Sequence, residues 1–290
     1  MATVTFSRRS LSAPRLGLTA LMVLICLAWL VPLWMLVITA MKSVREYSNE
    51  LTAWTLPEHP LQIFSNIATA WTTAGIGPGF LASLLYGVVG ASIAILFASM
   101  GAYALTRLHV RGKFLWFVLV FSGTLFPFQM YLIPLFKLYQ TTGLYDTRVG
   151  MICFYVAICI PFCLFVMQSF FLTVPREIQE AGRLDGCSDF GILWRLFLPL
   201  ARGPIAVLFL FQFTWVWNDL TFGLVLSTSD GIRPIMPSLA ALQGTFATTG
   251  PPISMAAAIV ASIPTLVVFL LLGRYFVQGL TLTAGAGRRA

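Results

Sequence analysis

Long apolar stretches separated by short polar segments run through the whole chain. A helix that crosses the hydrocarbon core of a bilayer needs about 20 mainly apolar residues. Six stretches meet this requirement: Leu16–Met41, Phe80–Leu105, Phe114–Leu135, Val149–Leu172, Pro204–Leu226 and Ile253–Val277. The pattern therefore predicts an all-α polytopic membrane protein with six transmembrane helices.

Two of these stretches carry features that interrupt a regular helix. Pro127 and Pro134 lie in the third stretch, where neighbouring groups must satisfy the carbonyls that proline leaves free. Asp219 lies in the fifth stretch and is the sole acidic residue within the six predicted spans. An ionisable group inside a membrane is a functional candidate by default. The alternative is that its carboxylate caps a local break near the outer end of the fifth helix.

Composition agrees with a membrane location. The 290 residues are 58% hydrophobic and 10% charged, whereas an average soluble domain is about 25% charged. So few charges do not cover the surface of a soluble protein of this size, which argues against ordinary cytosolic enzymes. The net charge is +8, but the basic residues form short runs between apolar blocks. Such runs indicate membrane orientation rather than nucleic-acid binding.

The positions of these basic residues predict the orientation. The N-terminal segment, the 107–113 loop, the 173–203 loop and the end from Arg274 hold 13 of the 18 Lys and Arg residues. Because cytosolic loops are enriched in Lys and Arg, both termini are expected in the cytosol. The expected organisation is a cytosolic tail at 1–15, a first transmembrane helix at 16–41, an extracytoplasmic loop at 42–79, a five-helix core at 80–277 and a cytosolic tail at 278–290.

The 173–203 loop is expected to contain two short helices. Pro175 suits the first position of a helix, and Gly186 suits a helix stop. Ser188 is expected to cap a second, almost wholly apolar helix that Pro199 ends. The first helix combines acids with a small Ala181-Gly182 step, which suits docking into a partner. An amphipathic connector resting on the lipid surface is the alternative.

The same loop resembles the EAA loop of ABC importer permeases. That pattern is Glu-Ala-Ala, three residues, Gly, nine residues, Ile, one residue and Leu-Pro. This chain has the same spacing in Glu180-Ala181-Gly182, Gly186, Leu196 and Leu198-Pro199. Gly182 stands where the second Ala is usual, which loosens a helix by up to about 1 kcal/mol. Leu196 stands where Ile is usual, and Asp185-Gly186 matches the usual Asp-Gly.

Three further segments are similar to permeases of the maltose-type carbohydrate importer family. They are Ala102–Leu108, Trp217-Asn218-Asp219 and Phe276–Leu280. Of the two permeases in that family, the chain resembles the shorter one, which has six helices. The resemblance implies a subunit of a prokaryotic inner membrane, paired with a second permease as a heterodimer. It also implies two cytosolic ATPase subunits, an extracytoplasmic solute-binding protein and a carbohydrate substrate. The residues expected to couple to the ATPase are Glu180, Ala181, Gly182, Asp185, Gly186 and Pro199 of the matching pattern, together with Glu177 near the start of the same helix.

The chain lacks a phosphate-binding loop of its own. That motif needs Gly, four residues, and Gly-Lys followed by Ser or Thr. Around Gly112-Lys113, Arg107 stands in place of the first Gly and Phe114 in place of Ser or Thr. The chain is therefore expected not to be an enzyme and to bind no cofactor or metal. ATP and Mg are expected on the partner ATPase subunits.

A carbohydrate pathway needs aromatic surface and hydrogen-bonding groups. The candidates are Phe126, Gln129 and Tyr131 on the third helix and Trp217, Asn218 and Asp219 on the fifth. Trp217 is alternatively an interfacial residue, and Gln129 alternatively satisfies a carbonyl freed by Pro134. The alternative function is a proton-coupled secondary transporter that uses Asp219, although such transporters usually carry a relay of several acids or histidines.

Overall fold

The structure is a computed structural model that describes residues 13–48, 54–73, 75–243 and 249–286. These residues form helices, turns and loops, and no strand occurs among them. Within the described ranges, four helices are long and apolar enough to cross a membrane. The number is five if the bent pair Asp189–Leu200 and Arg202–Trp217 is one span. The predicted all-α membrane fold is confirmed, whereas the count of six spans is not.

The first half of the chain contains two of these spans, followed by shorter helices. Its elements are α1 (Ala13–Ala40), α2 (Val44–Tyr47), α3 (Gln62–Thr72), α4 (Ile76–Leu85), a π-helical turn (Tyr86–Gly90), α5 (Ala91–Arg107), α6 (Lys113–Ser122), a 3-10 turn (Phe128–Tyr131) and α7 (Leu132–Thr142). Helices α4 and α5 and the π-helical turn form one continuous span, Ile76–Arg107.

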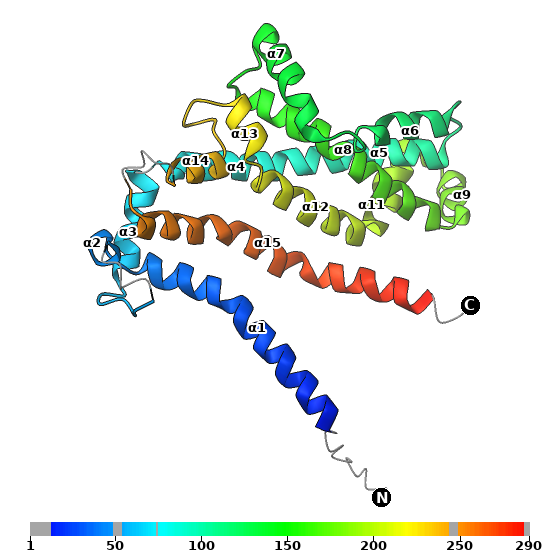
Figure 1. Ribbon diagram of the computed structural model, residues 1–290. Helices are drawn as coiled ribbons and strands as arrows, with labels where there is room; N and C mark the ends of the chain where they lie inside the picture. Colours follow the sequence, from blue (N-terminus) through cyan, green and yellow to red (C-terminus); the bar gives the residue numbers. More distant parts are fainter. Residues whose placement is uncertain (1–12, 49–53, 74, 244–248, 287–290) are drawn as a thin grey trace, which may run out of the picture.

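The second half contains the span Arg148–Thr173, the two-helix loop, the bent pair and the span Pro251–Gly273. Its elements are α8 (Arg148–Thr173), α9 (Arg176–Leu184), α10 (Asp189–Ile192), a second π-helical turn (Leu193–Phe197), α11 (Leu198–Leu200), α12 (Arg202–Trp217), α13 (Thr221–Leu226), α14 (Ile235–Ala241) and α15 (Pro251–Ala286). Helices α5, α8, α12 and α15 run along the length of the molecule (Figure 1).

Small residues on α5 allow α8 to approach closely. Ala94, Ala98 and Ala102 recur every four residues, so they share one face of the helix, and each is at most 1% exposed. A Cβ on Gly101 would lie 3.2 Å from Cδ1 of Leu164 on α8. The close pairing of α5 and α8 therefore forms the centre of the bundle.

Helix α1 lies at the edge of the molecule. It contacts α3 and α15 near its C-terminal end and diverges from the bundle toward its start (Figure 1). Its apolar side chains are largely uncovered, and Trp29 is 76% exposed. The side chain of Asn66 on α3 holds the end of α1, because its Nδ2 donates to the carbonyls of Ala40 and Lys42 at 2.8 Å each.

The ends of the bundle bear on the predicted topology. Helices α2, α3 and α14 lie at one end and α9 at the other (Figure 1). The start of α1 and the end of α15 point toward the end that holds α9. This is the arrangement required if both termini share a side with the 173–203 loop, and the side of the membrane stays a prediction.

The third predicted span, Phe114–Leu135, is broken in the region of the prolines that were expected to interrupt it, and it does not form one membrane-length helix. Helix α6 ends at Ser122, and α7 begins at Leu132. Pro127 stands between them with extended backbone, at φ −56° and ψ 126°, because its ring fixes φ and it lacks an N–H donor. Pro134 lies in the first turn of α7, where an N–H has no helical partner in any case.

The prediction that the apolar helix ends at Pro199 was wrong by a small margin. The helix continues to Leu200, and the 76° bend follows between Leu200 and Arg202. Pro199 is accommodated because it lies within the first two residues of α11, directly after the π-helical turn. The fifth stretch is likewise divided, since α12 ends at Trp217 and α13 begins at Thr221.

Candidate functional site

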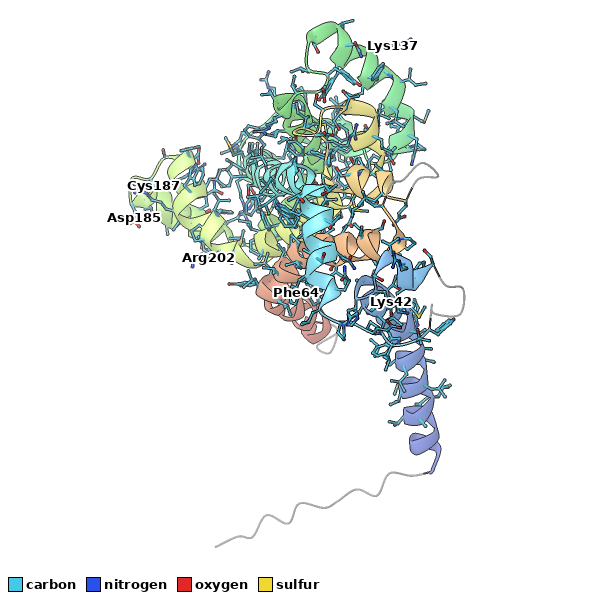
Figure 2. The ribbon with its side chains drawn as sticks, turned by 90° about the vertical axis from the view of Figure 1, so that its left-hand side faces the viewer. Lys42, Phe64, Lys137, Asp185, Cys187 and Arg202 are labelled. Atoms are coloured by element: carbon cyan, nitrogen blue, oxygen red, sulfur yellow. The ribbon has the colours of Figure 1, made fainter. Side chains whose placement is uncertain are left out.

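Helix α9 and the turn after it project from one end of the molecule, where Figure 2 shows Asp185 and Cys187 at the tip. Gly186 ends the helix at φ +77°, a conformation that side-chain-bearing residues rarely adopt. The hydroxyl of Ser188 then accepts a hydrogen bond from the N–H of Gly191 at 3.2 Å and caps α10. The predicted turn at Gly186 and cap at Ser188 are confirmed.

The two faces of α9 differ. Five of the predicted coupling residues are exposed on it or directly after it: Glu177, Glu180, Ala181, Asp185 and Gly186. Gly182 is buried, because a Cβ there would lie 2.9 Å from Cδ1 of Leu196 and 3.1 Å from Cγ1 of Ile192. The small size of Gly182 therefore allows α9 to pack on the helix that follows it in the same chain.

Arg107 fixes this loop to the end of the second span. Its guanidinium donates hydrogen bonds to the carbonyls of Phe171 and Val174, and its central carbon lies 5.1 Å from the centroid of the Phe197 ring. Nε2 of Gln179 on α9 donates to the Arg107 carbonyl at 3.4 Å. Sequence reasoning gave Arg107 no role in holding this loop.

An ion pair holds α9 against α10. The guanidinium of Arg183 lies 2.8 Å from Oδ1 of Asp189, and hydrogen bonding to this carboxylate raises the pKa of Arg183. Together with Arg107 and Gly182, the pair gives the projecting loop a defined orientation relative to the spans. These contacts connect α9 to the end of α5 and, through Arg107, to the end of α8.

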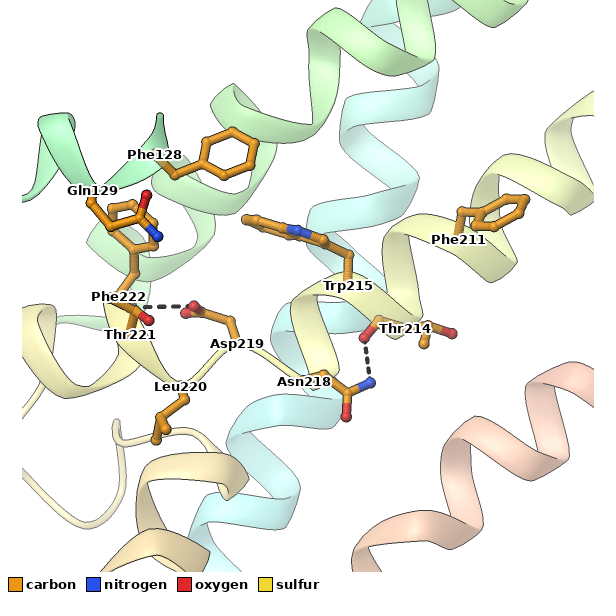
Figure 3. A pocket seen from close by; sticks show the side chains of 10 residues that line it. All are labelled: Phe128, Gln129, Phe211, Thr214, Trp215, Asn218, Asp219, Leu220, Thr221 and Phe222. Carbon is orange, nitrogen blue, oxygen red and sulfur yellow. Dashed lines mark hydrogen bonds between the residues drawn. The ribbon is translucent and has the colours of Figure 1, made fainter. Parts of the chain in front are cut away.

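A cavity of about 550 Å³ lies where α12 ends, beside the 3-10 turn and α13 (Figure 3). Its walls combine aromatic and polar side chains: Phe128, Gln129, Phe211, Thr214, Trp215, Asn218, Asp219, Leu220, Thr221 and Phe222. The Phe128 and Trp215 rings meet edge to face with centroids 5.8 Å apart. Flat rings beside amide and hydroxyl groups match the chemistry that a carbohydrate needs.

Three of the six predicted pathway residues line this cavity: Gln129, Asn218 and Asp219. Phe126 is exposed outside it, and Tyr131 lines a neighbouring cavity of about 370 Å³. Trp217 is only 2% exposed, and its Nε1 donates to the carbonyl of Ala261 on α15 at 2.9 Å. It is thus a core residue, which also excludes the interfacial position considered for it.

Sequence reasoning missed the aromatic wall of the cavity. Four lining residues on α12 and its C-cap fall at positions i, i+3, i+4 and i+7: Phe211, Thr214, Trp215 and Asn218. Residues at these intervals share one face of a helix. The choice of Asn218 therefore already indicated the other residues on its face of the helix. Trp217 is adjacent to Asn218 and so lies about 100° away from it around the helix, on a different face.

Asp219 closes the break between α12 and α13. Its Oδ2 accepts hydrogen bonds from the Tyr155 hydroxyl at 2.9 Å and the Gly223 N–H at 3.0 Å. Its Oδ1 accepts from the Phe222 N–H at 3.3 Å (Figure 3). These bonds satisfy N–H groups at the start of α13, so the carboxylate acts as a cap although it borders the cavity.

A second carboxylate, Asp146, orders the loop after α13. It accepts hydrogen bonds from the N–H groups of Thr228 at 2.8 Å and Ser229 at 3.0 Å and from both hydroxyls. Partial burial by itself raises the pKa of Asp146, but these hydrogen bonds outweigh it and lower the pKa to about 2. Sequence analysis did not single out Asp146, since no motif or apolar pattern surrounds it.

Comparisons with known proteins agree with this geometry. Residues 92–282 match the family described as "Binding-protein-dependent transport system inner membrane component". The chain is 34% identical to the diacetylchitobiose uptake system permease protein NgcG of Streptomyces coelicolor, over 73% of this chain and 68% of that protein. It is 34% identical to the alpha-glucoside transport system permease protein AglG of Rhizobium meliloti, over 83% and 64%. A crystal structure of a bacterial ABC transporter involved in the import of alginate has the same fold, with a TM-score of 0.75, 22% identity and coverage of 94% of this chain and 100% of that one.

Proposed function

The chain belongs to the family of binding-protein-dependent transport system inner membrane components, and we propose that it is the permease subunit of an ATP-driven ABC importer for a carbohydrate. Relatives named for diacetylchitobiose and alpha-glucoside transport support the substrate class. The observation that carries the proposal is the projecting helix α9, which the Arg107 contacts and the Gly182 packing hold in one orientation.

Helix α9 is the surface on which the ATPase docks. Its exposed Glu177 and Glu180 supply polar contacts, and Ala181 allows close approach because its side chain is a single methyl group. Gly186 returns the chain to α10, and Gly182 and Pro199 act within the loop rather than at the partner surface. Hydrolysis in the partner then moves α9 and, through Arg107, the spans.

The cavity at the end of α12 is the part of the sugar pathway that this subunit contributes. Trp215 and Phe128 offer ring faces to a sugar, while Gln129 and Asn218 offer amide donors and acceptors. The neighbouring break at 218–220 supports this role, because irregular backbone at membrane depth is expected where a cavity is lined. The pathway is completed by a second permease, which faces this subunit.

The complete transporter contains this chain, the second permease as a heterodimer, two cytosolic ATPase subunits that bind ATP and Mg, and an extracytoplasmic solute-binding protein. Both termini lie in the cytosol. Purification of the tagged full-length chain from its own cells tests this composition. A subunit with a phosphate-binding loop is expected to co-purify with the chain. This subunit is expected to be lost when α9 is replaced by a Gly-Ser linker. An undiminished yield of the ATPase with that variant refutes docking on α9.

Proton coupling through Asp219 is the competing function. The hydrogen bonds from Tyr155, Phe222 and Gly223 favour a cap instead. Asn keeps one acceptor oxygen and cannot carry a transported proton. Substitution of Asp219→Asn is therefore expected to leave uptake independent of the proton gradient. Uptake that collapses with a protonophore at constant ATP in the unsubstituted transporter supports the competing function.

A further inference from the structure

A second polar cavity, of about 370 Å³, lies beside α9 at the end of the second span. Helix α5, the turn at 108–112, the start of α6 and one side of α9 enclose it. Four of its lining residues are basic: Arg107, Lys113, Arg176 and Arg183. One acid, Glu180, stands on the same wall, and Arg183 also pairs with Asp189. The cavity therefore carries a positive excess that the coupling role of α9 does not use.

The position of two of these cations opposes local helix stability. Helix α6 begins at Lys113, and α9 begins at Arg176. Negative residues are favoured at helix N-termini, since the backbone dipole is positive there. Both helices instead bring a cation and a positive helix end to the same cavity. The cations and the helix ends together attract an anionic ligand more strongly than one cation alone would.

The cavity opens next to a surface suited to lipid. Helix α6 continues from Lys113 with apolar side chains that are uncovered, and Phe114 is 78% and Leu115 71% exposed. Trp116 follows at 55% exposed. Acyl chains placed along this face of α6 bring the headgroup to Lys113. Basic pockets at the cytosolic ends of transmembrane helices are suited to anionic headgroups.

We propose that this cavity binds the headgroup of an anionic phospholipid of the cytosolic leaflet. Lys113 and Arg176 hold the phosphate, and the Arg107 guanidinium, which already donates to Phe171 and Val174, adds long-range charge. The lipid then bridges α6 and the start of α9, so membrane composition influences the orientation of the docking helix. The inference rests on the proposed function for the cytosolic placement of α9.

The test measures lipid binding rather than transport, so its failure is distinct from failure of the proposed function. The full-length chain, purified with its associated subunits in mild detergent, is incubated with phosphatidylglycerol or phosphatidylcholine and examined by native mass spectrometry. Retention of phosphatidylglycerol over phosphatidylcholine is expected. Lys113→Gln with Arg176→Gln is expected to reduce phosphatidylglycerol occupancy by on the order of tenfold. The matched control, Arg45→Gln with Lys137→Gln, removes two exposed cations elsewhere and is expected to bind as the unsubstituted chain does.

Three results overturn the proposal. The first is equal phosphatidylglycerol binding by the Lys113/Arg176 variant and its control. The second is displacement of the lipid by millimolar inorganic phosphate, which identifies the cavity as a site for a free anion. The third comes from a photoreactive amino acid in native membranes at position 110, where an uncharged valine lines the cavity. Crosslinking to phospholipid is expected, and crosslinking to a protein subunit instead shows that a partner occupies the cavity.

Discussion

Cδ1 of Leu196 lies 2.9 Å from the place where a Cβ on Gly182 would stand. These are the two positions at which the loop departs from the EAA pattern, and the structure brings them into contact. Leu and Ile have the same number of carbons but place their terminal carbons differently, and Cδ1 of Leu196 occupies the space that a Cβ at position 182 would need between α9 and the following helix. The two departures are thus explained together by one packing contact.

Gly182→Ala alone is expected to destabilise the loop. Overpacking costs about 1–3 kcal/mol, whereas the gain in helix propensity is up to about 1 kcal/mol. Adding Leu196→Ala removes the crowding atom and is expected to restore uptake lost in the single variant. A double-mutant cycle measured by thermal unfolding and by uptake checks this coupling, and strictly additive effects contradict it.

Gly186→Leu is expected to abolish transport while the chain still inserts. The φ of +77° strains a residue with a side chain by about 1–2 kcal/mol, and the turn places α9 relative to α10. Gly186→Asn is the matched control, because Asn tolerates this conformation better. Uptake at equal expression measures both variants. Full activity in Gly186→Leu would show that the turn geometry is dispensable.

Adjacent tryptophans are expected to behave differently. Trp215→Ala removes an aromatic wall of the cavity, so sugar uptake should fall while assembly and binding-protein-stimulated ATP hydrolysis remain. Trp217→Ala empties a core position and loses the bond to Ala261, with an expected cost of about 3–5 kcal/mol and poor assembly. Gln129→Ala and Asn218→Ala should resemble Trp215→Ala. Normal uptake in all three cavity variants places the pathway elsewhere.

Asp146 is expected to make the loop at 227–234 sensitive to acid. Its pKa is about 2 in the folded chain and 3.8 ordinarily, so its stabilisation is fully present above about pH 4 and is lost as the pH falls toward 2. The difference in Tm between the unsubstituted chain and Asp146→Asn should therefore shrink across this window. Asp230→Asn, an exposed change in the same loop, is the control. A difference that stays constant from pH 5 to pH 2 would contradict the assignment.

The sequence correctly predicted the spans that are continuous apolar helices. It did not predict the helix ends that proline sets or the burial of side chains that tertiary contacts set. Hydropathy identified α8 to within one residue at each end, because one long uncharged run specifies one helix. It did not place the end of α6 at Ser122, since most of the residues that follow are still apolar and Pro127 marks only the region of the break. Nor did it reveal the inward face of Gly182 or the burial of Trp217, which depend on packing against residues distant in sequence.

The energy source of uptake tests the central claim most directly. The purified transporter is reconstituted in proteoliposomes with its solute-binding protein, and uptake of a labelled oligosaccharide is measured with ATP available to the ATPase side and no proton gradient. The account predicts uptake that requires hydrolysable ATP, disappears in Gly186→Leu and is unchanged by a protonophore. Uptake driven by an imposed proton gradient without ATP would contradict it.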